Sequence, residues 1–87
     1  MQMSMEGMMA GLEGKTGDTF DKAFIQEMVM HHQGAIDMAN EAIANAQHDE
    51  IKSLANAIIS AQTNEISEME TWYTSWYGTD VHASMHH

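Results

Sequence analysis

Three side chains that can bind a soft metal lie about one helical turn apart in the segment EMVMHHQGAIDMA. They are Met28, His31 and His32. A second segment, QTNEISEMETW, has the same kind of spacing in Gln62, Glu65 and Met69. Residues three or four apart share one face of a helix. If the two segments fold back on each other, the two sets meet and form a candidate metal site.

The donor types indicate which metal fits. Thioether sulfur is a soft ligand that favours Cu(I), and Ag(I) by the same chemistry, whereas imidazole accepts copper, zinc or nickel. A calcium site would need several oxygen ligands at fixed spacing, and no such loop is visible. No Glu has a His three residues later, and HExxH is absent, which argues against a di-iron bundle or a zinc protease. Copper, as Cu(I) or Cu(II), is the predicted ion, with silver as a further possibility.

Both ends of the chain repeat these donor types. The amino-terminal run is rich in methionine at Met1, Met3, Met5, Met8 and Met9. The carboxyl-terminal run contains His82, Met85, His86 and His87. Such clusters can wrap a soft cation, so these residues join the candidate ligands.

Helical spacing of the apolar residues predicts an all-α fold. One stripe runs from Phe20 to about Ala46, and a second runs from Ile51 to Trp76. Asp18 or Thr19 is the expected N-cap of the first helix, and Asp49 that of the second. The short connection makes the helices antiparallel neighbours of about 40 Å each. The predicted organisation is a Met-rich arm (1–17), a helical hairpin (18–78) ended by Gly78, and a loose tail (79–87).

In such a hairpin, residues whose numbers add to about 96 face each other. This places His31 near Glu65, Met28 near Met69, and Ala35 near Gln62. Buried polar groups that lack partners cost a few kcal/mol. The layer of His31, His32, Gln62 and Glu65 must therefore pair internally or hold an ion.

Composition excludes several functions. The chain of 87 residues has a net charge of −10, with Lys15, Lys22 and Lys52 as its cations. It lacks a basic patch for nucleic acid or anionic membranes. No stretch could span a bilayer, and no signal peptide is visible. No nucleophile–base pair or phosphate loop indicates an enzyme.

A lone hairpin leaves an apolar flank, which predicts a homodimer that completes a four-helix bundle.

Simpler interpretations remain open. A methionine on a helix seam more often fills the core than binds metal. The polar layer could be a structural network that fixes the helix register. The chain would then be a helical oligomerisation module without a metal role. A cupric oxidase or reductase using the His–Met site is a further alternative. The final two histidines could belong to a purification tag.

Two segments, DKAFIQEMVMHHQGAIDMA and AQTNEISEMETWY, resemble a family of secreted or periplasmic bacterial helical proteins. This family, long catalogued as a domain of unknown function, includes the CopM-like copper-binding proteins. The matching residues in this chain are Asp21, Phe24, Met28, His31, His32, Ala35, Met38, Ala39, Ile58, Gln62, Glu65, Ile66, Met69 and Trp72. The resemblance covers roughly residues 18–78.

The resemblance implies a ferritin-like helical bundle, an extracytoplasmic location, and copper or silver binding. It adds Met38 to the candidate ligands. Together with the donor pattern, it predicts a copper or silver binding protein that sequesters or transports the metal. The expected partners are metal ions and a second copy of the chain.

Overall fold

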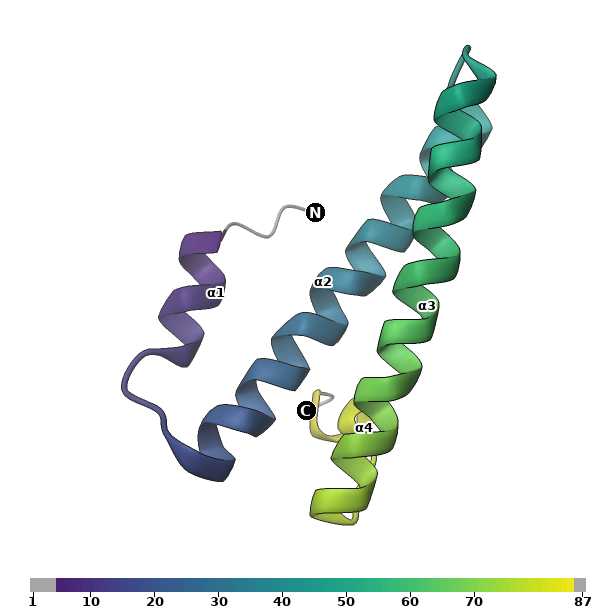
Figure 1. The fold of residues 1–87 in the computed structure, drawn as a ribbon. Coiled ribbons are helices and arrows are strands. Elements are labelled where there is room, and N and C mark those ends of the chain that lie inside the picture. Colours follow the sequence, from purple (N-terminus) through teal and green to yellow (C-terminus); the bar gives the residue numbers. More distant parts are fainter. Residues whose placement is uncertain (1–4, 86–87) are drawn as a thin grey trace.

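The computed structural model describes residues 5–85, with side chains described for residues 9–83. The described residues form four helices, namely α1 (Met5–Leu12), α2 (Gly17–Asn45), α3 (Asp49–Tyr77) and α4 (Val81–Met85). α2 and α3 are 29 residues each and lie antiparallel along most of their length (Figure 1). The predicted all-α hairpin is confirmed. None of the described helices is long and apolar enough to cross a membrane.

The helix ends differ slightly from the predicted ones. α2 begins at Gly17 with Thr16 as its N-cap, and α3 has His48 as its N-cap. Gly78 ends α3 as predicted: its φ of 72° is left-handed, and its N–H donates to the carbonyl of Thr74 at 2.8 Å. Glycine adopts this conformation without the Cβ clash that other residues suffer.

The core lies between α2 and α3 and extends to α4. Its buried residues are Ile25, Val29, Ile66, Met69, Tyr73 and Val81. Met28, Ile36 and Tyr77 are partly buried against this cluster. The burial of Val81 explains why residues 81–85 form a helix where the sequence suggested a loose tail. The apolar contact fixes this short segment against the hairpin, and isolated helices of this length are unstable in water.

The open end of the hairpin is held by aromatic contacts. Gln26 Nε2 donates to the hydroxyl of Tyr73 at 3.2 Å, and the rings of Tyr73 and Tyr77 meet edge to face with centroids 4.9 Å apart. The ammonium of Lys22 lies 4.7 Å from the Tyr77 ring centroid, close enough for a cation–π interaction. Desolvation raises the pKa of Tyr77, and the charge of nearby Asp18 raises it further.

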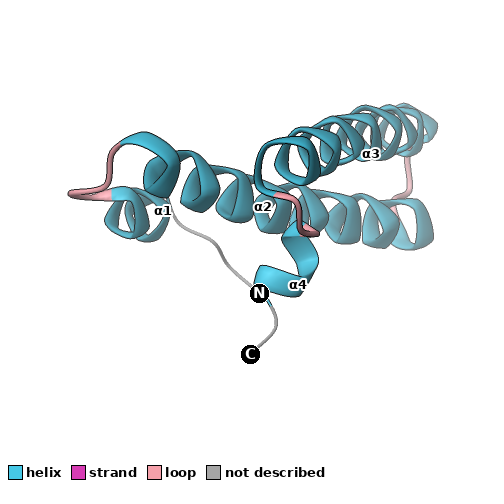
Figure 2. Cartoon of the chain, turned by 90° about the horizontal axis from the view of Figure 1, so that it is seen from below, coloured by secondary structure: helices cyan, strands magenta, loops and turns pink. Residues whose placement is uncertain are grey.

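The two short helices lie on different sides of the hairpin. α1 lies beside α2, away from α3, whereas α4 lies against one face formed by α2 and α3 together (Figure 2). The opposite face of the hairpin has no further described helix against it. This arrangement decides which side chains of α2 and α3 remain exposed.

Candidate metal centre

A histidine and a carboxylate pair across the seam at mid-length of the hairpin. Nε2 of His32 on α2 lies 2.5 Å from Oε1 of Glu65 on α3, which is hydrogen-bond distance. The side chain of His32 is 8% exposed, and that of Glu65 is 54% exposed. The pair therefore lies at the edge of the seam, with the imidazole inside and the carboxylate reaching the surface.

The predicted pairing of His31 with Glu65 is wrong by one residue. His31 is exposed, and its ring lies 6.1 Å from that of His32, centroid to centroid. One residue rotates a side chain by about 100° around the helix axis. A register estimate accurate to one turn cannot therefore decide which of two adjacent histidines enters the seam.

The hydrogen bond to Glu65 determines which ring nitrogen of His32 carries the proton. An ionised carboxylate can only accept hydrogen bonds, so Nε2 of His32 carries the hydrogen. In the neutral ring the lone pair then resides on Nδ1. This Nδ1 is buried and has no hydrogen-bond partner in the described structure. A histidine that binds a metal through one nitrogen usually donates its other N–H to a carboxylate or carbonyl, as His32 does here.

Two thioethers belong to the same part of the seam. Met69 is 7% exposed within the core, and Met28 packs against that core cluster. The predicted proximity of Met28 and Met69 is consistent with this packing. Gln62 is half-buried, and its Oε1 is buried without a partner. The centre of the hairpin thus combines soft sulfur donors with unpaired nitrogen and oxygen atoms.

Other predicted ligands lie away from this centre. Met38 is 69% exposed and Met9 is 63% exposed, so neither lies within the seam. The side chains of Met5, Met8 and Met85 are not described. Met1, Met3, His86 and His87 lie outside the described residues. Among the described residues, no three His, Asp or Glu side chains form a ready-made metal cluster.

A second histidine–carboxylate pair was not predicted. Nε2 of His82 on α4 bonds Oε2 of Glu70 on α3. The backbone N–H of His82 also donates to Oδ1 of Asp80 at 2.7 Å, which is the bond of an N-cap. Asp80 after Gly78 was thus the sequence signal for a new helix. It could not reveal that the helix would bring His82 to Glu70.

Glu27 is a further, half-buried carboxylate that the sequence did not single out. Its Oε2 is buried without a partner, and its carboxylate lies against Gly11 of α1. A Cβ at position 11 would clash with this carboxylate. The amine of Lys15 donates to the carbonyl of Gly11 at 2.7 Å, which closes the end of α1. The Glu27 carboxylate therefore occupies the space where a side chain at position 11 would begin.

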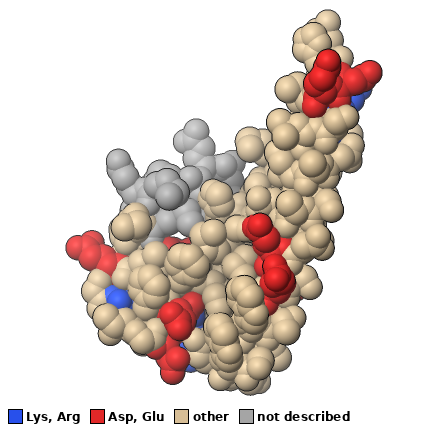
Figure 3. All heavy atoms as spheres, viewed as in Figure 1, with Lys and Arg blue, Asp and Glu red and all other residues tan. Residues whose placement is uncertain are grey.

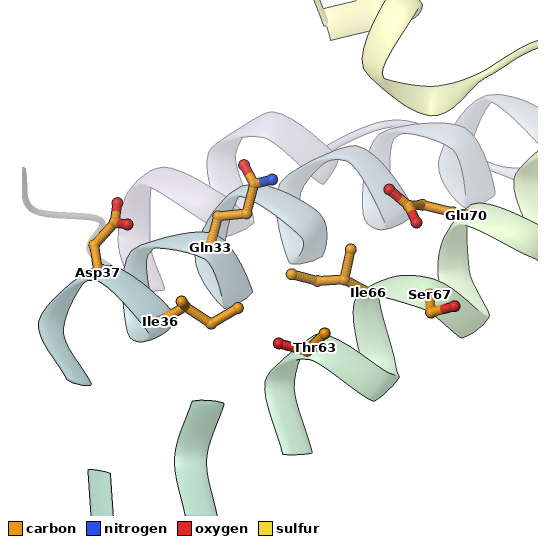
Figure 4. A pocket seen from close by; sticks show the side chains of 7 residues that line it. All are labelled: Gln33, Ile36, Asp37, Thr63, Ile66, Ser67 and Glu70. Carbon is orange, nitrogen blue, oxygen red and sulfur yellow. The ribbon is translucent and has the colours of Figure 1, made fainter. Parts of the chain in front are cut away.

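An open hollow of about 530 Å³ lies on the α4 side of the hairpin, between α2 and α3. Its lining residues are Gln33, Ile36, Asp37, Thr63, Ile66, Ser67 and Glu70 (Figure 4). None of the predicted ligands is among them. The hollow and the His32–Glu65 pair are thus different features of the seam.

The fold and the residues at mid-length of the seam define a class of protein. It is a small helical hairpin with a histidine–carboxylate pair and thioethers between its two long helices. The chain belongs to the family described as "Domain of unknown function (DUF305)", whose sequence profile matches residues 1–73 and also residues 21–87. This confirms the family resemblance drawn from the two sequence segments.

Two solved structures of the protein CopM are similar to this chain. CopM in the apo form is 51% identical, with a TM-score of 0.68 over 70% of this chain and 45% of CopM. CopM in the Cu(II)-bound form is 51% identical, with a TM-score of 0.66 over 70% of this chain and 46% of CopM. The chain therefore spans less than half of the CopM structures.

A viral protein is also similar to part of this chain. The "Uncharacterized protein L153" of Acanthamoeba polyphaga mimivirus is 39% identical over 51 residues, which cover 59% of this chain and 34% of the viral protein. Its description adds no information on function. The copper-bound CopM structure is therefore the more informative comparison.

Proposed function

We propose that this protein binds copper, and silver by the same chemistry, in order to sequester or transport the metal. The observation that carries the proposal is the buried, unpartnered Nδ1 of His32, whose ring is oriented by Glu65. Support comes from CopM, which has been solved in a Cu(II)-bound form and is 51% identical over the shared region.

The proposed central ligands are His32, Met28 and Met69, with His31 nearby on the surface. Thioethers favour Cu(I) and Ag(I), whereas imidazole binds both copper states. Glu65 is proposed to orient His32 rather than to bind the metal. The exposed and terminal donors are proposed to collect ions around this centre. They are Met38, Met3, Met5, Met8, Met9, His82, Met85, His86 and His87.

We also propose a binding role without catalysis, in a periplasmic or secreted setting. The location rests on the family resemblance. The homodimeric, ferritin-like four-helix bundle belongs to the same proposal, because a single hairpin covers only one side of each long helix.

The test is a thermal unfolding titration of the pure protein with Ag(I), Cu(I) and Cu(II). Seven of the terminal donors are first removed by replacing the methionines at 3, 5, 8, 9 and 85 with Leu and the histidines at 86 and 87 with Asn. A ligand at a hundred times its Kd stabilises the native state by about 2.7 kcal/mol. For a domain of this size, that raises Tm by roughly 10–20 °C.

His32→Ala in this background should abolish most of the rise, and His48→Ala is the matched control at an exposed histidine in the connection. Mg²⁺ should have no such effect. An unchanged Tm across all three soft-metal titrations would refute the central site. It would favour the structural interpretation, in which the polar layer only fixes the helix register. An equal rise in the His32→Ala variant would place the metal elsewhere.

A further inference from the structure

Three methionines lie on the surface of the described helices, where they contribute little to the packing of the core. Met9 on α1 is 63% exposed, and Met30 and Met38 on α2 are 41% and 69% exposed. Helix formation does not require methionine at an exposed position, since leucine, lysine and glutamate favour a helix about as well. Met30 also has no part in the proposed copper site. The property that these three residues share is a thioether that solvent reaches.

Two other methionines are protected between the long helices. Met69 is 7% exposed within the core, and Met28 packs against the same cluster of apolar residues. Oxidation turns the thioether of methionine into a polar sulfoxide, which disrupts a packed core. A sulfoxide at Met69 would bury an oxygen among apolar side chains, and a buried polar group without a partner destabilises the fold. The same reaction at an exposed position leaves the new oxygen in water, where it disturbs no packing.

The charge of the protein indicates which oxidants reach these thioethers. The chain has a net charge of −10, which disfavours the approach of anionic oxidants. Figure 3 shows a side of the molecule on which the surface over α2 and α3 is largely free of charge, while the carboxylates gather at the hairpin tip, near the opposite end and at one place along α3. A neutral peroxide, such as hydrogen peroxide or an organic hydroperoxide, meets no electrostatic barrier.

We propose that the exposed methionines Met9, Met30 and Met38 consume neutral peroxides and thereby preserve the buried thioethers of Met28 and Met69. The sulfur attacks one oxygen of the peroxide, the O–O bond breaks and an S–O bond forms. The departing oxygen takes the proton of the transferred one and leaves as water, or as an alcohol from an organic hydroperoxide. The sulfur loses two electrons, and the peroxide gains them.

This function goes beyond copper binding and does not depend on a bound metal. One exposed methionine consumes one peroxide molecule, so the protection is stoichiometric. Enzymes that reduce methionine sulfoxide restore the thioether, after which the same methionine can react again. The exposed positions suit this cycle, because a sulfoxide on the surface remains accessible to such an enzyme.

Peptide mass spectrometry of the metal-free, unmodified chain in hydrogen peroxide measures the order of oxidation. Met30 and Met38 should be oxidised about tenfold or more faster than Met69, because reactivity follows exposure. The Tm should stay constant while only exposed methionines carry oxygen, and should fall by roughly 5–20 °C once Met69 is oxidised. Equal rates for Met38 and Met69 would overturn the proposal, as would a Tm that falls while Met69 is still reduced.

A limiting amount of peroxide tests the protection itself. The reference is a chain in which the methionines at 3, 5, 8 and 85 are replaced by Leu. Replacing Met9, Met30 and Met38 by Leu as well should raise the oxidised share of Met69 about twofold or more at one equivalent of hydrogen peroxide. The reason is that competing thioethers divide the oxidant according to their rates.

Ile51→Leu in the reference chain is the matched control, since Ile51 is an exposed apolar residue without sulfur. It should leave the oxidised share of Met69 unchanged, and circular dichroism confirms that each variant is folded. An unchanged share after loss of the three exposed methionines, or an equal rise in the control, would overturn the protection. Because these experiments contain no metal, such a failure leaves the proposed copper function standing.

Discussion

Replacement of Glu65 by Gln tests how the central histidine is prepared for metal. The change keeps the size of the side chain but replaces a carboxylate by an amide, which can also donate to His32. The proton of the imidazole is then no longer confined to Nε2, and Nδ1 is not always free. Loss of an orienting partner of this kind typically lowers metal affinity by about 10–100-fold. That corresponds to about 1.4–2.7 kcal/mol of binding free energy.

The same substitution should change the metal-free protein much less. The Glu65 side chain is 54% exposed, so water replaces much of what the pair contributes. We expect a loss of less than about 1 kcal/mol in the free energy of unfolding. The large effect on metal binding and the small effect on folding together distinguish an orienting role from a structural one.

Competition titration against a chromogenic Cu(I) chelator measures the affinity, and urea unfolding without metal measures the stability. Glu68→Gln is the matched control, because Glu68 is exposed on the same helix and loses the same charge. Wild-type affinity in Glu65→Gln would refute the orienting role. An equal loss in Glu68→Gln would show that only the overall negative charge matters. A loss far above 100-fold would make Glu65 itself a ligand.

Three further substitutions test the packing around the hairpin. Val81→Ala should lower the free energy of unfolding by about 2 kcal/mol, measured by urea, because Val81, the first residue of α4, is fully buried in the core. Thr79→Ala, at an exposed position, should not. Gly11→Ala should only turn the Glu27 carboxylate aside, because the atoms that the new Cβ meets are the end of a flexible side chain, and a loss of more than about 1 kcal/mol in thermal unfolding would contradict this. Gly78→Ala should cost about 1 kcal/mol in thermal unfolding, since its φ is 72°.

The two long helices could be predicted because the local sequence pattern and the packing of the two helices favour the same structure. Apolar spacing, a three-residue connection and the absence of proline all favour two straight antiparallel helices. The register was predicted to within one or two residues from the position of the connection alone. At the central layer, however, one residue separates a buried His32 from an exposed His31.

The width of the apolar stripes limited the prediction of the core. The apolar stripe predicted on α2 was wide enough to include Phe24, which is 43% exposed, whereas the buried line passes through Ile25, Val29 and His32. On α3 the stripe combined residues that enter the seam with Trp72 and Trp76, which remain exposed. A helix that contacts two neighbours has two adjacent apolar faces, and periodicity in one sequence does not separate them.

The position of Glu65 links copper binding to the proposed homodimer. Its carboxylate bonds the buried His32 from the exposed edge of the seam, where solvent screens it. A second copy of the chain that covered this edge would remove the water and strengthen every electrostatic interaction of the carboxylate. Metal binding at His32 and homodimer formation would therefore favour each other, because coupling between two binding events is reciprocal. Copper affinity should then rise with protein concentration, and dilution should release the metal.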